Sequence, residues 1–201
     1  MRNRPAARKR IRLAGAASHP GGERLYPLLD EDIIKQKVRE LARKISGDYA
    51  GRPLLLVGVL KGAWVFMADL VRAITIPVAC DFLGVSSYGV STETSGVVKI
   101  VVDLKHPVEG QHVLIVEDIV DTGLTLNFLV ETLRLRHPRS VKVCALLDKP
   151  ARHKVDVKID YLGFTVPNQF LVGYGIDYAE RYRNLAYIGY LEFPDEAKKS
   201  V

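Results

Sequence analysis

Residues 113–125 read VLIVEDIVDTGLT, and this stretch indicates the class of fold. Four apolar residues lead directly into Glu117 and Asp118, and Asp121 follows just before a Thr-Gly turn. A continuous apolar run bounded by turn residues is typical of a strand that is buried on both faces of a sheet. Ligands of open α/β sheets bind outside the carboxyl ends of the strands. The three acids are therefore candidates for a binding or catalytic site.

The turn that follows the acids, Thr122 to Thr125, is predicted to open a helix and to bind a phosphate. A helix N-terminus carries about half a positive charge and several free N–H groups, and the two threonine hydroxyls add donors. The acids would repel a phosphate, so we expect them to face sugar hydroxyls, a Mg²⁺ ion or a carbon that gains positive charge. The alternative is an ordinary helix cap formed by Asp121 or Thr122, with two surface acids before it. Three acids and T-G-x-T directly after a buried strand favour the functional interpretation.

Strand and helix patterns alternate along the rest of the chain. Residues 30–45 are predicted to form a helix that Asp30 caps and Gly47 ends, because apolar residues repeat on one face. Further helices are expected at 64–74 and 122–136, and strands at 54–59, 78–88, 97–103, 113–118, 141–148, 160–164, 170–175 and 187–191. This alternation predicts an α/β fold with a mainly parallel sheet flanked by helices. The polar loop 89–96 between two long strands predicts an antiparallel flap.

Size and composition fit one domain. The chain has 201 residues, of which 48% are hydrophobic, and no apolar run approaches the length of a membrane span. Cys80 and Cys144 lie in apolar stretches and are expected to be small buried hydrophobes, which argues against a disulfide framework and for a reducing, cytoplasmic setting. Trp64 is expected on the packed face of a helix. The five histidines lie outside every motif and are expected at the surface or in loops.

The positive charge of the chain is concentrated at its start. Residues 1–24 contain seven basic residues and one acid, which accounts for the formal net charge of +6, and the remaining chain is neutral. The segment has no apolar period, so we interpret it as a disordered basic arm. The arm is weakly similar to a transit peptide and is the only hint of nucleic acid. A solvated tail is the favoured interpretation, because the body lacks the basic face of a nucleic-acid binder.

The acidic turn resembles the phosphoribosyl-diphosphate binding signature of type I phosphoribosyltransferases, and it is similar more narrowly to that of the hypoxanthine-guanine phosphoribosyltransferases. Other motifs of this family match in order: LKGA at 60–63, VSSYG at 85–89, SGVVKI at 95–100, DK at 148–149 and FLVGYGIDYAERYRNL at 170–185. The resemblance covers residues 25–193 and leaves out the arm 1–24 and a tail, 194–201. It implies the type I fold, with a mobile β flap and a small C-terminal hood formed mainly by about 150–193 with the N-terminal part.

The resemblance implies Mg²⁺-dependent transfer of a phosphoribosyl group from phosphoribosyl diphosphate to N9 of a 6-oxopurine. Asp121 would be the acid or base at purine N7, and Glu117 and Asp118 would hold the ribose hydroxyls. The 5′-phosphate would lie on a loop formed by Asp121, Thr122, Gly123, Leu124 and Thr125. Leu124 stands where some relatives carry Lys. The metal ligands would come from Glu117, Asp118 and Asp177.

The resemblance assigns the pyrophosphate to Lys61, Gly62 and Arg183. From the residues alone, a solvated Lys-Gly loop explains the first two and a surface salt bridge between Asp177 and Arg183 explains the last, so these assignments depend on the family pattern.

The purine would contact Lys149, Phe170, Leu171 and Asp177. Lys149 would donate to O6, which disfavours adenine, and Phe170 would stack on the base. Plain core packing of Phe170 is an equally good interpretation of its strand pattern.

Residues 86–96 are expected to form a lid with Ser87 and Tyr88 at its hinge, and an ordinary polar hairpin is the alternative.

Two other functions stay open at this point. A phosphoribosyl-diphosphate-sensing regulator of the same fold is one, and a xanthine-preferring phosphoribosyltransferase is the other. The intact acids and the purine contacts favour a hypoxanthine-guanine enzyme. The family resemblance also implies a homodimer or homotetramer.

Overall fold

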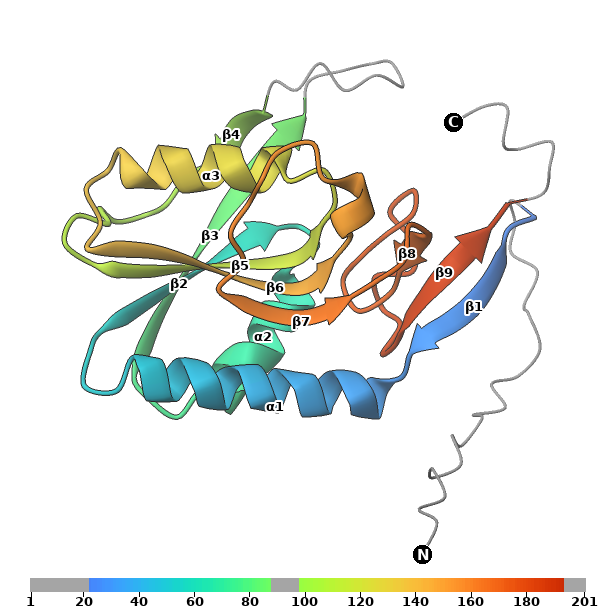
Figure 1. The fold of residues 1–201 in the computed structure, drawn as a ribbon, viewed down its shortest axis with the longest axis horizontal. Coiled ribbons are helices and arrows are strands. Elements are labelled where there is room, and N and C mark those ends of the chain that lie inside the picture. The colour runs from blue at the N-terminus through green and yellow to red at the C-terminus, as the bar shows by residue number, and fades with distance from the viewer. Residues whose placement is uncertain (1–21, 88–97, 194–201) are drawn as a thin grey trace, which may run out of the picture.

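A computed structural model of the chain describes residues 22–87 and 98–193, and it confirms the α/β class (Figure 1). In chain order the elements are β1 (Arg24–Leu29), α1 (Glu31–Asp48), β2 (Leu54–Leu60), α2 (Trp64–Ala73), β3 (Val78–Ser87), β4 (Val98–Val102), β5 (His112–Val120), α3 (Leu124–Arg134), β6 (Ser140–Asp148), the short 3₁₀ helix η1 (Pro150–Arg152), β7 (Tyr161–Thr165), β8 (Phe170–Val172) and β9 (Ile188–Glu192).

The central sheet has the strand order β4-β3-β2-β5-β6-β7. Strands β3, β2, β5, β6 and β7 run parallel, and only β4 pairs antiparallel with its neighbour. The carboxyl ends of β2, β5 and β6 therefore meet at one edge of the sheet. This edge is where the predicted binding residues were expected.

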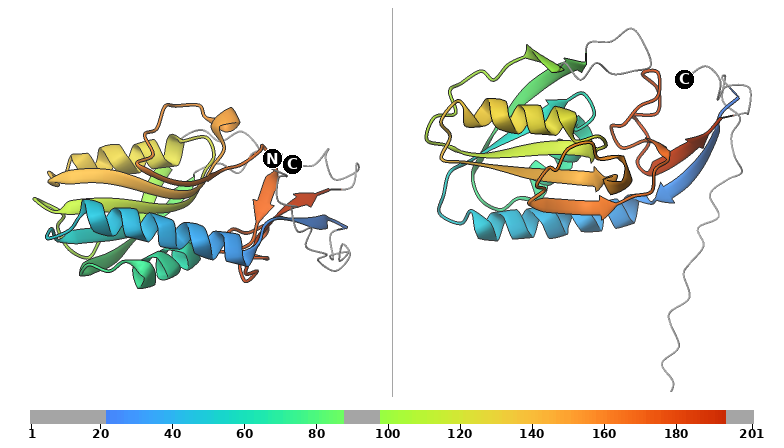
Figure 2. Two further views of the ribbon diagram at one scale, coloured as in Figure 1. Left: turned by 60° about the horizontal axis from the view of Figure 1, so that its bottom comes forward. Right: turned by 45° about the horizontal axis from the view of Figure 1, so that its top comes forward.

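Helices cover both faces of the central sheet, as the turned view in Figure 2 shows. Helices α1 and α2 pack on one face through residues such as Ile34, Val38 and Phe66, and α3 packs on the other through Leu126 and Leu129. Side chains of a strand alternate between its two faces, and β2 accordingly contributes its even-numbered and odd-numbered residues to different cores. This explains why β2 and β5 are apolar without interruption.

Helix α1 forms as its sequence predicts. Asp30 is the N-cap, and its Oδ1 atom accepts a hydrogen bond from the Ile33 N–H at 2.8 Å. The apolar face that contains Leu41 and Ile45 is buried. The helix continues past Gly47 to Asp48, so the predicted end is short by about one turn.

A second sheet, in the order β1-β9-β8, lies beyond the carboxyl ends of β6 and β7 (Figure 1). Strand β1 was not predicted, and it pairs antiparallel with β9, which lies near the other end of the chain. Arg24, which the sequence analysis assigned to the arm, is its first residue, and Glu23 before it is buried. Because β1 is stabilised by pairing with a distant strand, its six residues alone show little of the pattern that predicts a strand.

Three expectations about single residues were wrong. Cys80 is exposed on β3, whereas Cys144 is buried as expected. Trp64 has 50% of its surface exposed, and the packed face of α2 is formed instead by Phe66, Met67 and Leu70. His112 is a half-buried strand residue rather than a loop residue, and its Nδ1 lies 2.7 Å from the Ser140 hydroxyl.

Candidate active site

The predicted acids lie near the carboxyl end of β5. Strand β5 extends to Val120, two residues beyond its predicted end, and Glu117 and Asp118 belong to its last four residues. The backbone of Val120 accepts a hydrogen bond from the Lys149 N–H at 2.9 Å, which brings the ends of β5 and β6 together. The acidic turn and Lys149 are thus neighbours although 28 residues separate Asp121 and Lys149 in the sequence.

Both acids of the strand are placed where ionisation is unfavourable. Asp118 has only 8% of its surface exposed, and Glu117 Oε2 is a buried atom with no hydrogen-bond partner among the described residues. Burial raises the pKa of Asp118 to about 6, and the Asp177 charge adds to the rise, whereas backbone N–H groups and Arg183 oppose it. Burial, with the Asp118 charge, raises the pKa of Glu117 well above its ordinary value. Two acids that take part in no ion pair among the described residues thus lie at one edge of the central sheet. They indicate a site where a ligand supplies positive charge or hydroxyl donors.

The turn after β5 is a helix N-terminus with a glycine N-cap. The N-cap of α3 is Gly123, with φ 79°, which has no side chain to cap the helix. The alternative of an ordinary cap by Asp121 or Thr122 is realised only in part, because Thr122 Oγ1 accepts one long hydrogen bond, from the Leu124 N–H at 3.4 Å. A cavity of about 90 Å³ lies here, and it is lined by Glu117, Ile119, Val120, Asp121, Thr122, Gly123, Thr125 and Leu126.

The loop after β2 packs directly on the acids. A Cβ atom built at Gly62 would overlap the carboxylate of Asp118, so only glycine permits this approach. The carbonyl oxygen of Gly62 in turn lies against Gly175, which has φ 102°. The Leu60–Lys61 peptide bond is cis. The structure thus brings the predicted Lys61-Gly62 segment into contact with both Asp118 and the loop that follows β8.

Asp177 and Arg183 form an ion pair at 2.8 Å, as the salt-bridge interpretation expected. Their side chains retain only 29% and 19% of their exposed surface, so the pair is not a fully solvated one. Arg183 also donates to the Gly175 carbonyl at 2.8 Å, and its Nε is buried without a partner among the described residues. Lys61 Nζ lies 3.2 Å from the Glu180 carboxylate, a partner that sequence reasoning missed.

Asp121 has a partner that the motif did not reveal. Arg152 of η1 donates through Nε to Asp121 Oδ1 at 3.0 Å. Lys149 has only 7% of its surface exposed. Burial lowers its pKa, and the Arg152 charge acts in the same direction, while Asp121 opposes both. The only available signal for Arg152 was its position three residues after Lys149.

Two further contacts hold the turn that contains Lys149 on its other side. His153 Nε2 lies 2.7 Å from the buried carboxylate of Asp148, and the Lys154 N–H donates to the Thr122 carbonyl at 2.9 Å. Residues 148–154 therefore form a connection between the end of β6 and the open turn before α3.

Phe170 is not a core residue. It has 42% of its surface exposed at the start of β8, and its ring makes edge contacts with Tyr178 at 5.3 Å and Phe193 at 5.7 Å between centroids. The next residue, Leu171, is buried. The core-packing alternative for Phe170 is thus excluded, and an aromatic face is available near the surface.

The predicted lid is only partly described. Ser87 is the last residue of β3 and pairs with Val98 of β4, so the two flanking strands are antiparallel as predicted. Tyr88 and the rest of the expected lid up to residue 96 lie outside the described residues.

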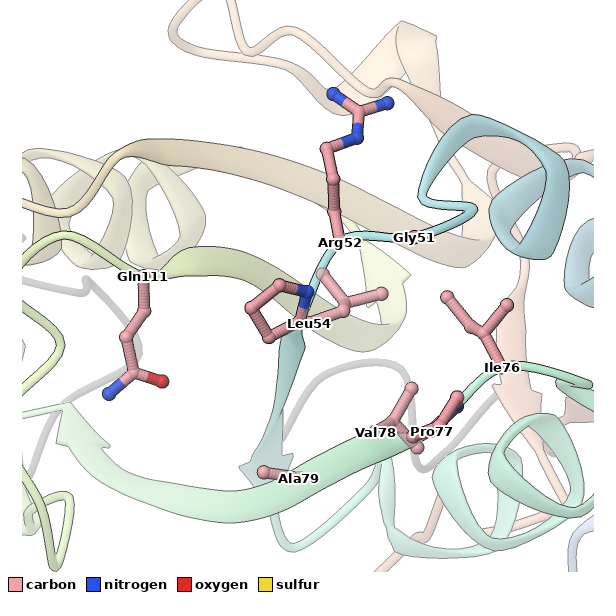
Figure 3. Close-up of a pocket in the computed structure, with 9 residues that line it drawn as sticks. Gly51, Arg52, Leu54, Ile76, Pro77, Val78, Ala79 and Gln111 are labelled. Atoms are coloured by element: carbon pink, nitrogen blue, oxygen red, sulfur yellow. The ribbon is translucent and has the colours of Figure 1, made fainter.

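A separate cavity of about 420 Å³ lies at the opposite end of the central sheet (Figure 3). Leu54 and Val78, the first residues of β2 and β3, are among those that line it. The Arg52 side chain points away from the other labelled side chains and donates to the Asp48 carbonyl. None of the predicted site residues lines this cavity, so the candidate active site is the edge that carries the acids.

A family model described as the phosphoribosyl transferase domain matches residues 27–179. The hypoxanthine-guanine phosphoribosyltransferase of Bacillus subtilis is 53% identical over 165 residues, which cover 82% of this chain and 92% of that protein. The enzyme of the same name from Mycobacterium avium is 51% identical over 180 residues, with 84% and 89% covered.

The chain belongs to the phosphoribosyltransferase family, and within it to the hypoxanthine-guanine phosphoribosyltransferases.

Solved structures and other relatives agree with this membership. A hypoxanthine phosphoribosyltransferase of Staphylococcus aureus superimposes with a TM-score of 0.80 at 46% identity, covering 83% of this chain and 91% of that one. A bifunctional TilS/HprT protein of Listeria monocytogenes is 53% identical over 165 residues, but the chain spans only 26% of that relative's length.

Two absences hold for the described part of the phosphoribosyltransferase chain. Across residues 22–87 and 98–193, no helix is both long and apolar enough to span a membrane. Within the same ranges, no three His, Cys, Asp or Glu side chains are grouped so that they could hold a metal ion by themselves.

Proposed function

We propose that this phosphoribosyltransferase acts in purine salvage. It transfers the phosphoribosyl group of 5-phospho-α-D-ribose 1-diphosphate to N9 of hypoxanthine or guanine, and it releases pyrophosphate with IMP or GMP. The observation that carries the proposal is the position of two acids at one sheet edge, beside a helix N-terminus whose N-cap is Gly123: Asp118 is buried, and Glu117 is half-buried with a buried Oε2 atom. Such a site can bind a phosphate and favour positive charge on a sugar at separate points.

Positive charge develops on the ribose ring as the bond to pyrophosphate breaks. Glu117 and Asp118 accept hydrogen bonds from the ribose hydroxyls, and their negative charge favours the cation-like sugar. The free amides and hydroxyls of residues 121–125 hold the 5′-phosphate, and the small cavity at this turn supports that role.

Asp121 acts as the acid or base at purine N7. In the ligand-free chain its carboxylate is held by Arg152, so the charge of the carboxylate is balanced before the purine arrives. A positioned group of this kind contributes typically about 10²- to 10⁴-fold to the rate.

The purine lies between Lys149 and Phe170. Lys149 donates to O6, which selects 6-oxopurines because a 6-amino group cannot accept from an ammonium. The exposed ring of Phe170 supports stacking on the base, and the Leu171 and Asp177 backbone meets the edge of the base.

Pyrophosphate lies between the Lys61-Gly62 loop and Arg183. The contact of Gly62 with Asp118 supports this placement, because it brings the loop next to the predicted ribose site.

The carboxylates fit Mg²⁺, which binds oxygen ligands and is held in many phosphate-transfer sites by one or two carboxylates plus the substrate phosphates. Glu117, Asp118 and Asp177 would supply them, and the unpartnered Oε2 of Glu117 is consistent with a missing positive neighbour. When bound, Mg²⁺ neutralises charge on the leaving pyrophosphate. A site completed by the substrate also agrees with the lack of a preformed three-ligand cluster in the described ranges.

The proposal includes a homodimer or homotetramer in the cytoplasm. Exposed apolar residues on β3 and β4, namely Phe82, Val101 and Val102, support self-association. Light scattering of the protein as it elutes from a gel-filtration column would measure the oligomeric state. The exposed, unpaired Cys80 is consistent with a reducing compartment.

The ordered domain is proposed to start at β1, with a hood formed by β8, β9 and β1 and with the arm and tail outside it.

An absorbance assay tests the function. Phosphoribosyl diphosphate is mixed with the protein and Mg²⁺, and hypoxanthine, guanine, xanthine and adenine are offered separately. Nucleotide from hypoxanthine or guanine that disappears with a chelator supports the proposal. A matched pair of variants separates the site from general charge effects, since Asp121→Asn should lose most of the activity and the exposed Asp156→Asn should keep it. Turnover of xanthine alone, or of no base despite phosphoribosyl-diphosphate binding, contradicts it.

A further inference from the structure

The buried carboxylate of Glu23 lies outside every motif of the sequence. It precedes β1, and only 1% of its surface is exposed. Its Oε1 atom accepts a hydrogen bond from the Tyr182 hydroxyl at 2.8 Å and lies 3.0 Å from Nη2 of Arg181. A buried carboxylate is unfavourable unless such partners compensate for the lost water. These two partners, Arg181 and Tyr182, lie in one short segment near the other end of the chain.

That segment, residues 177–183, is named here the 177–183 loop. Its backbone contains three non-glycine residues with positive φ: Ala179 at 50°, Glu180 at 60° and Tyr182 at 76°. Tyr178 and Arg181 close a tight turn through two backbone hydrogen bonds of 3.1 and 3.0 Å. Residues in such sparsely populated conformations persist only where their surroundings hold them. Glu23 contacts the loop at Arg181 and Tyr182, and Tyr182 is itself one of the residues with positive φ.

The same loop carries Asp177 and Arg183, which form the ion pair at 2.8 Å. Arg183 follows Tyr182 directly, and its Nη1 donates to the Gly175 carbonyl. Gly175 packs against Gly62, so the loop is in contact with the Lys61-Gly62 segment as well. A change at Tyr182 therefore moves the groups that face the proposed pyrophosphate site.

We propose that Glu23 is a positioning residue that holds the 177–183 loop in the geometry that binds the pyrophosphate of phosphoribosyl diphosphate. This inference rests on the proposed placement of pyrophosphate at Arg183. Glu23 touches neither substrate, and it acts through Tyr182 and Arg181. The residue that precedes β1 thereby becomes part of the support of the active site.

The Glu23→Gln variant tests the inference with little change of shape. The amide still accepts one hydrogen bond, but the charge that holds Arg181 is lost. Since a hydrogen bond to a charged group corresponds to roughly 10- to 100-fold in an equilibrium constant, we expect the KM for phosphoribosyl diphosphate to rise about tenfold. The KM for hypoxanthine should stay unchanged. The exposed Glu192 of β9 supplies the matched control, and Glu192→Gln should change neither constant.

Hydrogen exchange gives a readout that does not depend on activity. In Glu23→Gln, the backbone amide of Arg181, which donates to the Tyr178 carbonyl, should exchange faster, while amides of α1 keep their rates. Tyr182→Phe removes the hydrogen bond from the Tyr182 hydroxyl to Glu23 and should have the same effects. The double variant should be worse than either single one by less than the sum of the two effects, because both contacts hold the loop to the same carboxylate.

Arg183→Gln separates this inference from the proposed function. If Arg183→Gln raises the KM for phosphoribosyl diphosphate but Glu23→Gln and Tyr182→Phe do not, the pyrophosphate site stands and the role of Glu23 is wrong. If Arg183→Gln leaves that KM unchanged, the placement of pyrophosphate fails and the inference fails with it. Lower thermal stability of Glu23→Gln with both KM values unchanged would show a purely structural role and would also overturn the inference.

Discussion

Replacing Asp118 with Asn should stabilise the ligand-free protein, and the gain should depend on pH. The carboxylate is buried, and its pKa is raised from the ordinary 3.8 to about 6. The difference, at about 1.4 kcal/mol per pKa unit, corresponds to roughly 3 kcal/mol. Between the two pKa values the folded state binds more protons than the unfolded state, so stability falls as the pH rises from about 4 to about 6. Above about pH 6 the folded protein bears the full free-energy cost of burying an ionised Asp118, and asparagine removes this cost.

Urea unfolding at a series of pH values measures this effect. The free energy of unfolding of Asp118→Asn should exceed that of the wild type by up to about 3 kcal/mol at pH 8, with little difference at pH 4. Asp156→Asn, on an exposed position, controls for the change of net charge. Because the Asp118 charge helps to raise the pKa of Glu117, the variant should also ease ionisation of Glu117. A stabilisation of equal size at both pH values would refute the electrostatic explanation.

The remaining predictions concern the substrates. Asp121→Asn should lower kcat by about 10²- to 10⁴-fold while the affinity for phosphoribosyl diphosphate, measured by equilibrium binding, stays the same; near-full activity would contradict its role. Gly62→Ala should weaken phosphoribosyl-diphosphate binding, since a Cβ would overlap the Asp118 carboxylate, and an unchanged KM would argue against the close approach. Lys149→Gln should reduce kcat/KM for hypoxanthine more than for adenine, because an amide can both donate and accept; equal losses in competition assays would contradict selection by Lys149.

The sequence was most informative where a segment is determined by its own residues. Strand β2 is apolar throughout because both faces of it are covered, and α1 shows a buried stripe and a capping Asp30. Strand β1 could not be found in this way. Its residues alternate weakly in burial, and its partner β9 lies at the far end of the chain.

Errors at single residues have physical reasons as well. Cys80 lies in an apolar run, but β3 is covered incompletely, so the residue is exposed. Trp64 is the first residue of α2, and the buried face of this helix begins only at Phe66. The strand predicted to end with the acids at 117 and 118 continues to Val120, because its pairing with β6 extends to Asp148.

The roles of the site residues depend on partners that no local pattern contains. Arg152 meets Asp121 only because the turn after β6 folds over the end of β5. Glu180 meets Lys61 across 119 residues of sequence. Motifs therefore identify which residues can do chemistry, whereas the ion pairs that hold them in the ligand-free state follow from the topology of the sheet.

These ion pairs have a common consequence for the proposed reaction. Three cations of the site, Lys61, Arg183 and Arg152, are each paired with a carboxylate of the chain. If pyrophosphate without a metal ion bound one of these cations, the carboxylate that had been paired with that cation would be left unpaired near the buried acids. A substrate that arrives with a divalent cation brings both signs of charge, so the cations and the carboxylates can exchange partners together. The chain can then keep strongly unfavourable acids at its ligand-free site, because the ligands that complete the site also neutralise them.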